Sequence, residues 1–453
     1  MGIKNSLRSL KTIREDSPVV TPPPLVVQPP GKKRILCWSD GVVATTGFGI
    51  VSKHILRALY DTGKYDISQL AINYFGDFYD KKEYPYQLVP ARLRDPRDPY
   101  GKEMLLSSLE KGSFDYLFII NDSYVTFQVV EKILELREKL VREGKPRFKI
   151  VYYYPVDCRL WPDTAKMIKA ADHAVAYNYF GKMRTEVDIG MSPHSVIYHG
   201  VDNNHFFPIE PSGLQGFREN VMKVPDPETF VWINVNRNSP RKDMAKTILA
   251  FSEFKKIVPN TRLYMHTKVV DGPGAMMLDL SIPCRDLGLQ SINDVIFPQD
   301  FHPAEGVAVQ TLNMLFNACD GCITTTTGEG WGLSCTDCQA TGTPVLVPNN
   351  TSFPEIIGMD EERGYMYPCK ERVYIDGQGL RPVGQLQDIV DTMVRLYEDC
   401  RSGKVNDRIN NGLAFAHQNS WDNIGRQWVA LFEELDNKQE VVNPMVPRGV
   451  EEI

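Results

Sequence analysis

The residues best suited to chemistry concentrate in one stretch of the chain, TTTTGEGWGLSCTDCQATGTP at residues 324–344. Glu329 stands there between two glycines, which let the backbone approach a ligand closely. A buried carboxylate in such a loop would accept hydrogen bonds from neutral hydroxyl groups, as in a sugar site. A helix is predicted from about Ser334 through Asp337 to Ala340, and its first amides can donate to a phosphate. Asp337 lies where it could hold a second diol, such as a ribose.

Two other loops carry residues that could bind an anion or a hydroxyl group. Arg237 and Lys242 lie five residues apart in NRNSPRKD, directly after an expected strand. A guanidinium and an ammonium at a strand end can neutralise a diphosphate, and a basic turn exposed to water has the same pattern. Gly47 and Gly49 precede an expected helix in TTGFGIVSKHIL, where they fit either an anion-binding helix start or a plain tight turn.

Alternating strands and helices must position these loops. Buried parallel strands are predicted by short apolar runs at 35–38, 116–120, 150–154, 174–177 and 195–198, and then at 230–235, 262–266, 295–297, 322–325 and 344–347. Amphipathic segments fill the gaps between the runs. The pattern predicts an α/β protein with two successive doubly wound domains, split near residue 205. Ligands of such sheets bind at the carboxyl ends of the strands, where the three loops lie.

Composition limits the class of protein. The 453 residues are 42% hydrophobic and 24% charged, with a formal net charge of -6, which argues against a non-specific nucleic-acid binder. No apolar run approaches the length of a membrane span, and the N-terminus lacks the apolar core of a secretory signal. Nine cysteines without such a signal indicate reduced thiols. We therefore expect a cytoplasmic protein.

Two Cys-x2-Cys pairs offer a rival interpretation, a structural zinc site. Cys319 and Cys322 form the first pair, and Cys335 and Cys338 form the second. Chelation would require abandoning the strand expected between the pairs, and cysteine also serves as a small apolar core residue. We therefore predict no metal site.

Four segments, in order, resemble the retaining GT-B glycosyltransferases of the family 4 type. TGFGIVSKHIL resembles the glycine loop of their N-terminal domain, and SVIYHGVDNNHFFP resembles their domain junction. VNRNSPRKD is similar to their Arg and Lys phosphate loop, and GEGWGLSCTDCQATGTPVLVPN to their Glu-x7-Glu signature. The resemblance covers roughly residues 32–436 and implies two Rossmann-like domains facing a central cleft.

The resemblance also implies roles for individual residues. The donor would be a nucleotide-diphosphate sugar, such as a UDP- or GDP-sugar, held mainly by the C-terminal domain. Arg237 and Lys242 would bind its diphosphate and Glu329 its sugar hydroxyls. The remaining donor contacts would come from Asp337 at the ribose and from the amides of Gly330, Trp331, Gly332 and Leu333 at the sugar or phosphate.

This chain departs from the family pattern at two positions. The second acidic residue of the signature is Asp337 rather than Glu, and Asp157 in PVDCRLWPD lies where many relatives have a histidine. Asp157 is therefore a candidate catalytic residue, with a structural turn beside Pro155 as the alternative. His266 and Thr267 end an expected strand on the nucleotide side, where a structural histidine is the alternative. Gly47 and Gly49 would lie near the acceptor.

The implied reaction is sugar transfer with retention, without a metal ion or other cofactor. Arg237 and Lys242 would stabilise the charge that develops on the departing diphosphate. The alternative function is a nucleotide-sugar binding or epimerising protein on the same fold, because fold does not fix function. The acceptor is not identified by the sequence, and a modified DNA base is one alternative among small molecules, lipids, proteins and glycans.

The expected domain limits follow from these segments. Residues 1–31 form a tail and a Pro-rich linker, 32–205 the acceptor domain, 206–410 the nucleotide-sugar domain, 411–436 helices crossing back to the N-domain, and 437–453 a second tail. Ile3, Leu7, Leu10 and Ile13 share one face of a short basic N-terminal helix, which predicts either peripheral membrane contact or a solvated tail. Trp421, Ile424 and Trp428 predict a terminal helix packed across both domains.

Overall fold

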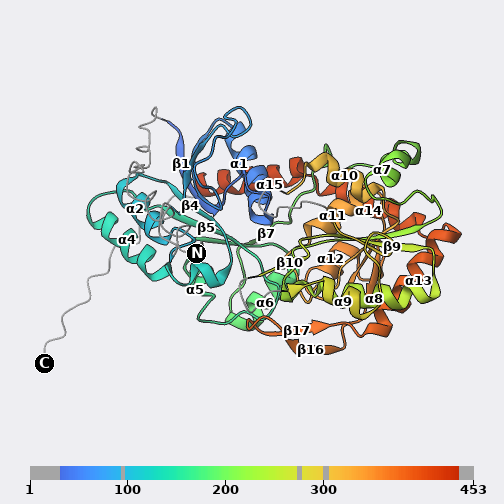
Figure 1. The fold of residues 1–453 in the computed structure, drawn as a ribbon. Helices are drawn as coiled ribbons and strands as arrows, with labels where there is room; N and C mark the ends of the chain where they lie inside the picture. The colour runs from blue at the N-terminus through green and yellow to red at the C-terminus, as the bar shows by residue number, and fades with distance from the viewer. Residues whose placement is uncertain (1–30, 93–96, 273–277, 299–305, 438–453) are drawn as a thin grey trace, which may run out of the picture.

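A computed structural model describes residues 31–92, 97–272, 278–298 and 306–437. The chain forms two α/β domains that lie side by side, each built on its own twisted sheet (Figure 1). The expected pair of Rossmann-like domains is therefore confirmed. The proposed N-terminal membrane helix and the C-terminal tail lie outside the described residues.

The sheet of the first domain, here called the N-domain, has seven parallel strands. Their order is β3 (Gln87–Pro90), β2 (Tyr65–Ile72), β1 (Lys33–Asp40), β4 (Tyr116–Ile120), β5 (Lys149–Tyr154), β6 (His173–Ala176) and β7 (Ser195–Val196). The helices of this domain are α1 (Gly47–Asp61), α2 (Lys102–Lys111), α3 (Ser123–Thr126), α4 (Val130–Arg142), α5 (Lys166–Ala170) and α6 (Tyr179–Ile189). The central strands β4 and β5 are almost continuously apolar and buried, and β1 is buried from Ile35 onward, as strands covered on both faces must be.

The sheet of the second domain, the C-domain, has six parallel strands. Their order is β12 (Val295–Ile296), β9 (Thr261–His266), β8 (Phe230–Val235), β13 (Gly321–Ile323), β14 (Val345–Pro348) and β15 (Tyr365–Tyr367). Its helices are α7 (Gln215–Asn220), α8 (Met244–Ile257), α9 (Ser281–Asp286), α10 (Val309–Asn317), α11 (Leu333–Ala340), α12 (Phe353–Ile357), α13 (Leu386–Ser402) and α14 (Asn406–Gln418), with 3-10 turns at Pro211–Gly213 and Pro240–Lys242.

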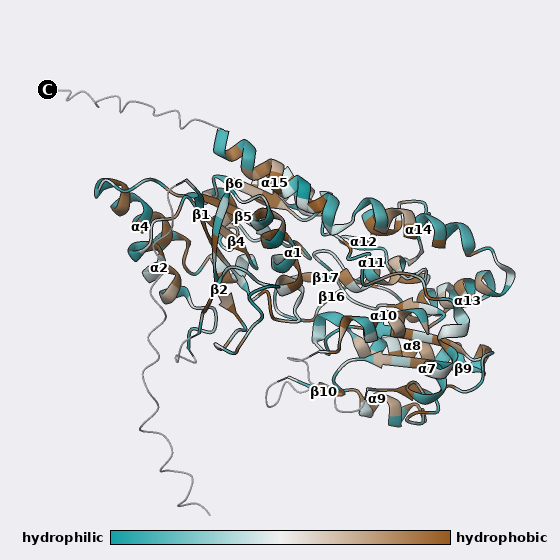
Figure 2. Ribbon diagram, turned by 90° about the horizontal axis from the view of Figure 1, so that it is seen from above, coloured by the Kyte–Doolittle hydropathy of each residue, from teal (hydrophilic) through white to brown (hydrophobic). Residues whose placement is uncertain are grey.

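Two short antiparallel hairpins are added to the C-domain. The first pairs β10 (Val270–Asp271) with β11 (Leu278–Asp279), and the second pairs β16 (Glu371–Tyr374) with β17 (Leu380–Val383). Apolar residues concentrate on the strands of the two sheets, whereas outer helices such as α4 and α14 carry much polar surface (Figure 2). None of the helices within the described residues is long and apolar enough to cross a membrane.

The apolar runs did not predict three strands of the two sheets, β2, β3 and β15, or the four hairpin strands, and several predicted runs extend past the observed strand ends. β2 reads YDISQLAI, and its polar residues interrupt the run although Gln69 is fully buried. The Gln69 side chain donates to the carbonyl of Asp40 and accepts from the amide of Val42, so it fixes the loop after β1. The strand expected at 195–198 ends at Val196, where the chain enters the domain junction.

The terminal helix α15 (Trp421–Asn437) returns to the N-domain, as Figure 1 shows. Its Trp428 and Phe432 are fully buried, and both rings pack on Phe118 of β4. Near its end, Asp436 accepts hydrogen bonds from the hydroxyls of Tyr65 and Tyr116. The preceding helix, α14, packs on α11 of the C-domain. Together α14 and α15 span both domains, with the crossing just before Trp421.

The limit expected at residues 410 and 411 falls inside α14. The amide of Trp421 donates to the carbonyl of Val201 in the domain junction, and the amide of Val201 donates to the carbonyl of Asn419. The Trp421 ring leaves no room for a side chain at Gly200. The crossing segment and the domain junction therefore form one hinge region.

We expect Trp428→Ala to destabilise the protein by about 3–5 kcal/mol, because it empties a fully buried site between α15 and the N-domain sheet. The measurement is chemical denaturation followed by fluorescence. Gln427→Ala on the exposed face of α15 is the matched control and should stay within about 0.5 kcal/mol of wild type. Equal losses in both variants would contradict the packing described here.

Candidate functional site

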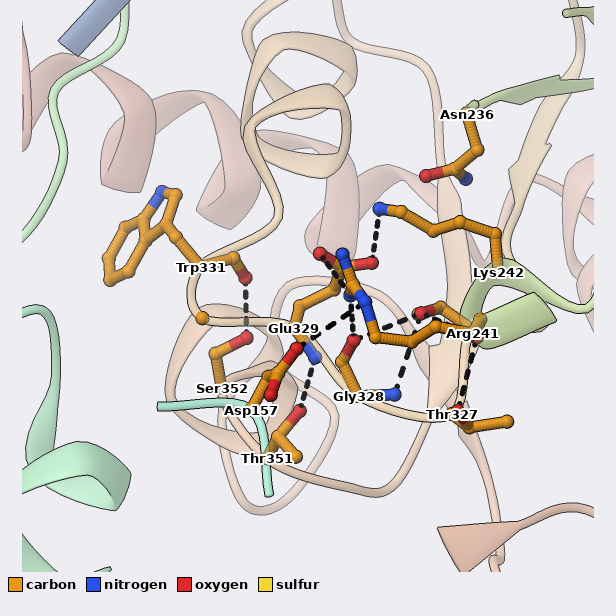
Figure 3. A network of polar contacts seen from close by, with 12 residues as sticks. Asp157, Asn236, Arg241, Lys242, Thr327, Gly328, Glu329, Trp331, Thr351 and Ser352 are labelled. Carbon is orange, nitrogen blue, oxygen red and sulfur yellow. Dashed lines mark hydrogen bonds and ion pairs between the residues drawn. The ribbon is translucent and has the colours of Figure 1, made fainter. Parts of the chain in front are cut away.

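The loops after β8 and β13 meet around the carboxylate of Glu329, which is only 8% exposed (Figure 3). One of its oxygens lies 3.1 Å from Nη1 of Arg241, and the other contacts Nζ of Lys242. Burial alone would raise the pKa of Glu329, but the charges of Arg241 and Lys242 outweigh it and lower that pKa to about 2. Glu329 is therefore ionised at neutral pH and held by two cations.

The four threonines before Glu329 explain why these two loops stay together. Thr324, Thr325, Thr326 and Thr327 are all buried, with exposed fractions of 8% or less. The amide and hydroxyl of Thr327 both donate to the carbonyl of Arg241, at 2.8 and 3.1 Å. The hydroxyl of Thr325 donates to the carbonyl of Asp243 at 2.7 Å. The threonine run thus fastens the 241–243 segment beside the Glu329 loop.

Asp157, from the loop after β5 of the N-domain, joins the same network. Its Oδ2 lies 3.3 Å from Nε of Arg241. Its Oδ1 lies 3.4 Å from Nη2 of Arg381, whose Nη1 also donates to the Asp157 carbonyl at 2.9 Å. Arg381 belongs to the β16–β17 hairpin and is fully buried, and its Nε lies 2.6 Å from Asp376. The sequence analysis singled out Asp157 but neither of its two arginine partners.

Arg237 is not part of this network. Its side chain is 74% exposed, and its Nε lies 3.1 Å from Asp271 of the β10–β11 hairpin. Of the expected pair, only Lys242 reaches Glu329, and the neighbouring Arg241 takes the second position. The spacing of basic residues could not reveal this, because Pro240 starts a 3-10 turn that ends in the left-handed conformation of Asp243.

The glycines around Glu329 are required by close contacts between the domains. A side chain at Gly330 would lie 2.8 Å from Pro155, and the Gly330 carbonyl accepts from Asn178 at 2.6 Å. Gly332 precedes α11 with a φ of 118°, a left-handed conformation that favours glycine. Leu333 is the first residue of α11 and lies beside Gly47 of the N-domain loop.

The other expected donor residues lie around this loop. Trp331 is buried and packs on Tyr198, and its carbonyl accepts from Ser352. Asp337 lies on α11 near Asp202 of the domain junction, and burial together with the charge of Asp202 raises the pKa of Asp337 well above its ordinary value. A ribose contact of Asp337 remains a prediction.

His266 and Thr267 lie buried at the carboxyl end of β9, one strand away from β8. Burial lowers the pKa of His266 to about 4, so its ring is neutral at physiological pH. The hydroxyl of Thr267 is buried without a hydrogen-bond partner among the described residues. An orphaned hydroxyl at this strand end is compatible with a ligand at the expected nucleotide position.

Gly47 and Gly49 lie at the start of α1. A side chain at Gly49 would lie 2.3 Å from the Ala44 carbonyl, and the Gly49 amide donates to the capping hydroxyl of Thr46. Gly49 therefore serves the tight turn, which was one of the two interpretations. Gly47 faces Leu333 across the domain contact.

The four cysteines of the two Cys-x2-Cys pairs belong to a hydrophobic core that includes β13 and α11. Burial raises the pKa of the Cys335 thiol well above its ordinary value, which disfavours the thiolate that zinc would need. The described residues contain no group of side chains arranged to hold a metal ion.

Two carboxylates at the site were missed by the sequence analysis. Asp40 ends β1, and Asp122 follows β4 by two residues. Burial raises the pKa of Asp122 to about 7, and the nearby charge of Asp157 adds to this increase. Inspecting the first acidic residue after every predicted strand would have found both positions.

Comparison with known proteins identifies solved structures of similar fold. No protein-family model and no curated protein sequence matches the chain. Sucrose-phosphate synthase from Thermosynechococcus elongatus has a similar structure, with a TM-score of 0.67 and 13% identity over 89% of this chain and 99% of its own. A glycosyltransferase from Rickettsia africae is also similar, with a TM-score of 0.65 and 14% identity over 90% of this chain and 100% of its own.

A third similar structure is WaaG, a glycosyltransferase involved in lipopolysaccharide biosynthesis, with a TM-score of 0.59 and 11% identity over 88% of this chain and 99% of its own. These solved structures have the GT-B fold, and this chain shares it. The expected fold class is therefore confirmed.

We expect Asp122→Asn to change how stability depends on pH. The folded-state pKa of Asp122, about 7, is above its ordinary value of 3.8, so ionisation of this group lowers stability as pH rises from about 4 through 7. The variant lacks this loss. The free energy of unfolding of the variant, minus that of wild type, should therefore increase as the pH rises. Above pH 8 this difference should have increased by at least about 1 kcal/mol.

Denaturant titrations at several pH values measure this difference. Asp61→Asn is the control, because Asp61 is exposed at the C-terminal end of α1. This variant should leave the shape of the curve of stability against pH unchanged. Parallel curves for wild type and Asp122→Asn would show that folding does not raise the pKa of Asp122.

Proposed function

We propose that this protein is a retaining glycosyltransferase that moves a sugar from a nucleotide-diphosphate sugar, such as a UDP- or GDP-sugar, to an acceptor hydroxyl. The observation that carries the proposal is the Glu329 carboxylate held by Arg241 and Lys242 beside a glycine-rich helix start. Such a carboxylate accepts hydrogen bonds from sugar hydroxyls, and the two cations suit a diphosphate. The glycosyltransferases of similar fold support the same class.

In the proposed reaction, the bond between the sugar's anomeric carbon and the diphosphate oxygen breaks as the acceptor oxygen bonds to that carbon on the same face. The electron pair leaves with the diphosphate, and the acceptor proton passes to a departing phosphate oxygen. Arg241 and Lys242 stabilise the negative charge that develops there. Because fixed cations fill this role, the proposal includes no metal ion.

Arg237 remains a proposed diphosphate ligand. Its ion pair with Asp271 is at the surface, where such pairs contribute about 0–1 kcal/mol, so turning the side chain toward a donor costs little. Thr267 and His266 would contact the nucleotide base, and Asp337 its ribose. All nine cysteines are free thiols, which supports a reducing, cytoplasmic setting.

Glu329→Gln and Arg241→Ala should each lower sugar transfer and donor hydrolysis at least about tenfold, because each loses a contact to charge or hydroxyls in the transition state. Arg237→Ala should do the same, because its side chain is proposed to turn to the diphosphate. The assay follows product and released nucleoside diphosphate from a panel of UDP-, GDP- and ADP-sugars.

Arg401→Ala is the matched control, because its ion pair with Glu228 is exposed and lies elsewhere in the C-domain. Melting curves must accompany each variant, since breaking a buried ion pair can itself unfold a protein. Folded variants with wild-type turnover would remove their residues from the site. Donor binding without any transfer would instead favour the alternative, a binding or epimerising protein.

Treatment with EDTA should leave both the melting temperature and sugar transfer unchanged, because the proposed charge stabilisation comes from Arg241 and Lys242. Elemental analysis of the purified protein accompanies the measurement. Stoichiometric zinc with unfolding on its removal, or transfer that returns only with added magnesium, would contradict the metal-independent mechanism.

A further inference from the structure

The β16–β17 hairpin carries an arginine that is fully buried, although arginine is almost never buried completely unless its charge is paired. Arg381 lies on β17, and its Nε lies 2.6 Å from the Asp376 carboxylate of the same hairpin. Its Nη1 donates to the Asp157 carbonyl at 2.9 Å. Its Nη2 donates to the Asp157 carboxylate at 3.4 Å and to the Gln378 side chain at 3.1 Å. The hairpin therefore directs a buried positive charge at the loop after β5 of the N-domain.

This charge lies close to Arg241, the cation proposed to stabilise the diphosphate. Arg241 donates to the Gly328 carbonyl (Figure 3), and a side chain at Gly328 would lie 3.0 Å from Nη1 of Arg381. Asp157 also bridges the two guanidinium groups. Its Oδ2 lies 3.3 Å from Nε of Arg241, and its Oδ1 lies 3.4 Å from Nη2 of Arg381. Both arginines are thus in contact with the same carboxylate.

The hairpin contributes to the balance of charge around Arg241. Glu329 and Asp157 both bring negative charge to Arg241. On the far side of Asp157, Arg381 adds a positive charge, and Asp376 adds a further negative charge beyond it. None of these side chains is more than 27% exposed, so water and salt screen their charges only in part.

We propose that the β16–β17 hairpin sets the affinity of the proposed donor site for a nucleoside diphosphate. Arg381 is a positioning residue that acts through Asp157 and does not touch the donor. It holds the Asp157 carboxylate and offsets its charge, so that Arg241 attracts the diphosphate more strongly. Asp376 has the opposite effect, because its negative charge offsets that of Arg381. This inference rests on the proposed function.

A purely structural role of the hairpin would have a different consequence. Removing either member of the Arg381–Asp376 ion pair would then disturb the same contact and weaken nucleotide binding in both variants. The electrostatic role predicts opposite signs. Loss of the positive charge weakens the binding of a diphosphate, and loss of the negative charge strengthens it.

Isothermal titration calorimetry of the full chain with UDP, GDP and ADP measures the binding. For the nucleotide that wild type binds, Arg381→Gln should lower the affinity about threefold to tenfold, and Asp376→Asn should raise it about twofold or more. A variant that combines both substitutions should return to within about twofold of wild type, because its two charge changes cancel.

Arg381→Lys retains the positive charge without the forked guanidinium contacts, so it should bind closer to wild type than Arg381→Gln does. Arg401→Gln and Glu228→Gln are the matched controls, because they make the same two charge changes at an exposed ion pair. Glu228 precedes the amino end of β8, whereas Lys242 follows its carboxyl end. Both controls should bind as wild type.

Melting curves accompany every variant, because Arg381→Gln leaves Asp376 without its buried partner. If Arg381→Gln does not fold, Asp376→Asn carries the test on its own, since damage to the site cannot tighten binding.

Weaker or unchanged binding by Asp376→Asn would overturn the inference. Equal shifts in Glu228→Gln and Asp376→Asn would overturn it too, because the effect would then come from net charge and not from the hairpin. Failure of the proposed function is distinguishable, because it appears in wild type as binding of none of the three nucleotides, which would remove the inference as well.

Discussion

Six charged side chains alternate in sign across the contact between the two domains, and the site depends on that row. In order they are Lys242, Glu329, Arg241, Asp157, Arg381 and Asp376. Each inner charge has an opposite charge on either side, which offsets the cost of burying it. Loss of Glu329 would leave the buried Lys242 without an opposite charge in this row, and loss of Arg381 would do the same to Asp376. The row therefore fixes the Glu329 carboxylate in position before any ligand arrives.

Asp157 is the only member of this row that the N-domain contributes. The β16–β17 hairpin reaches it from the C-domain through Arg381, and the hairpin's Gln378 carbonyl also accepts from Trp161 of the N-domain at 2.9 Å. Separating the domains would uncover the Asp157 carboxylate and two arginines together. The network thus links the relative position of the domains to the charge balance around Glu329.

Much of the fold could be predicted from the sequence, because buried parallel strands are marked by apolar runs. The strands around Ile35, Phe118 and Ile233 were found in this way. β2 was not predicted because polar residues interrupt its apolar run. One of them, the buried Gln69, is hydrogen-bonded to the loop after β1. Contacts between residues far apart in the sequence could not be predicted in this way. Arg241 and Arg381 are brought to Asp157 by a 3-10 turn and a hairpin, and the spacing of residues in the sequence does not reveal either contact.

The return of α15 to the N-domain has a consequence for how the protein is made. The core of the N-domain contains Trp428 and Phe432, which leave the ribosome only after the whole C-domain has been synthesised. Until then, Phe118 on the central strand β4 lacks both of its aromatic neighbours from α15. The first domain to emerge is thus the last to be completed, and its exposed apolar surface must be kept from aggregating throughout translation.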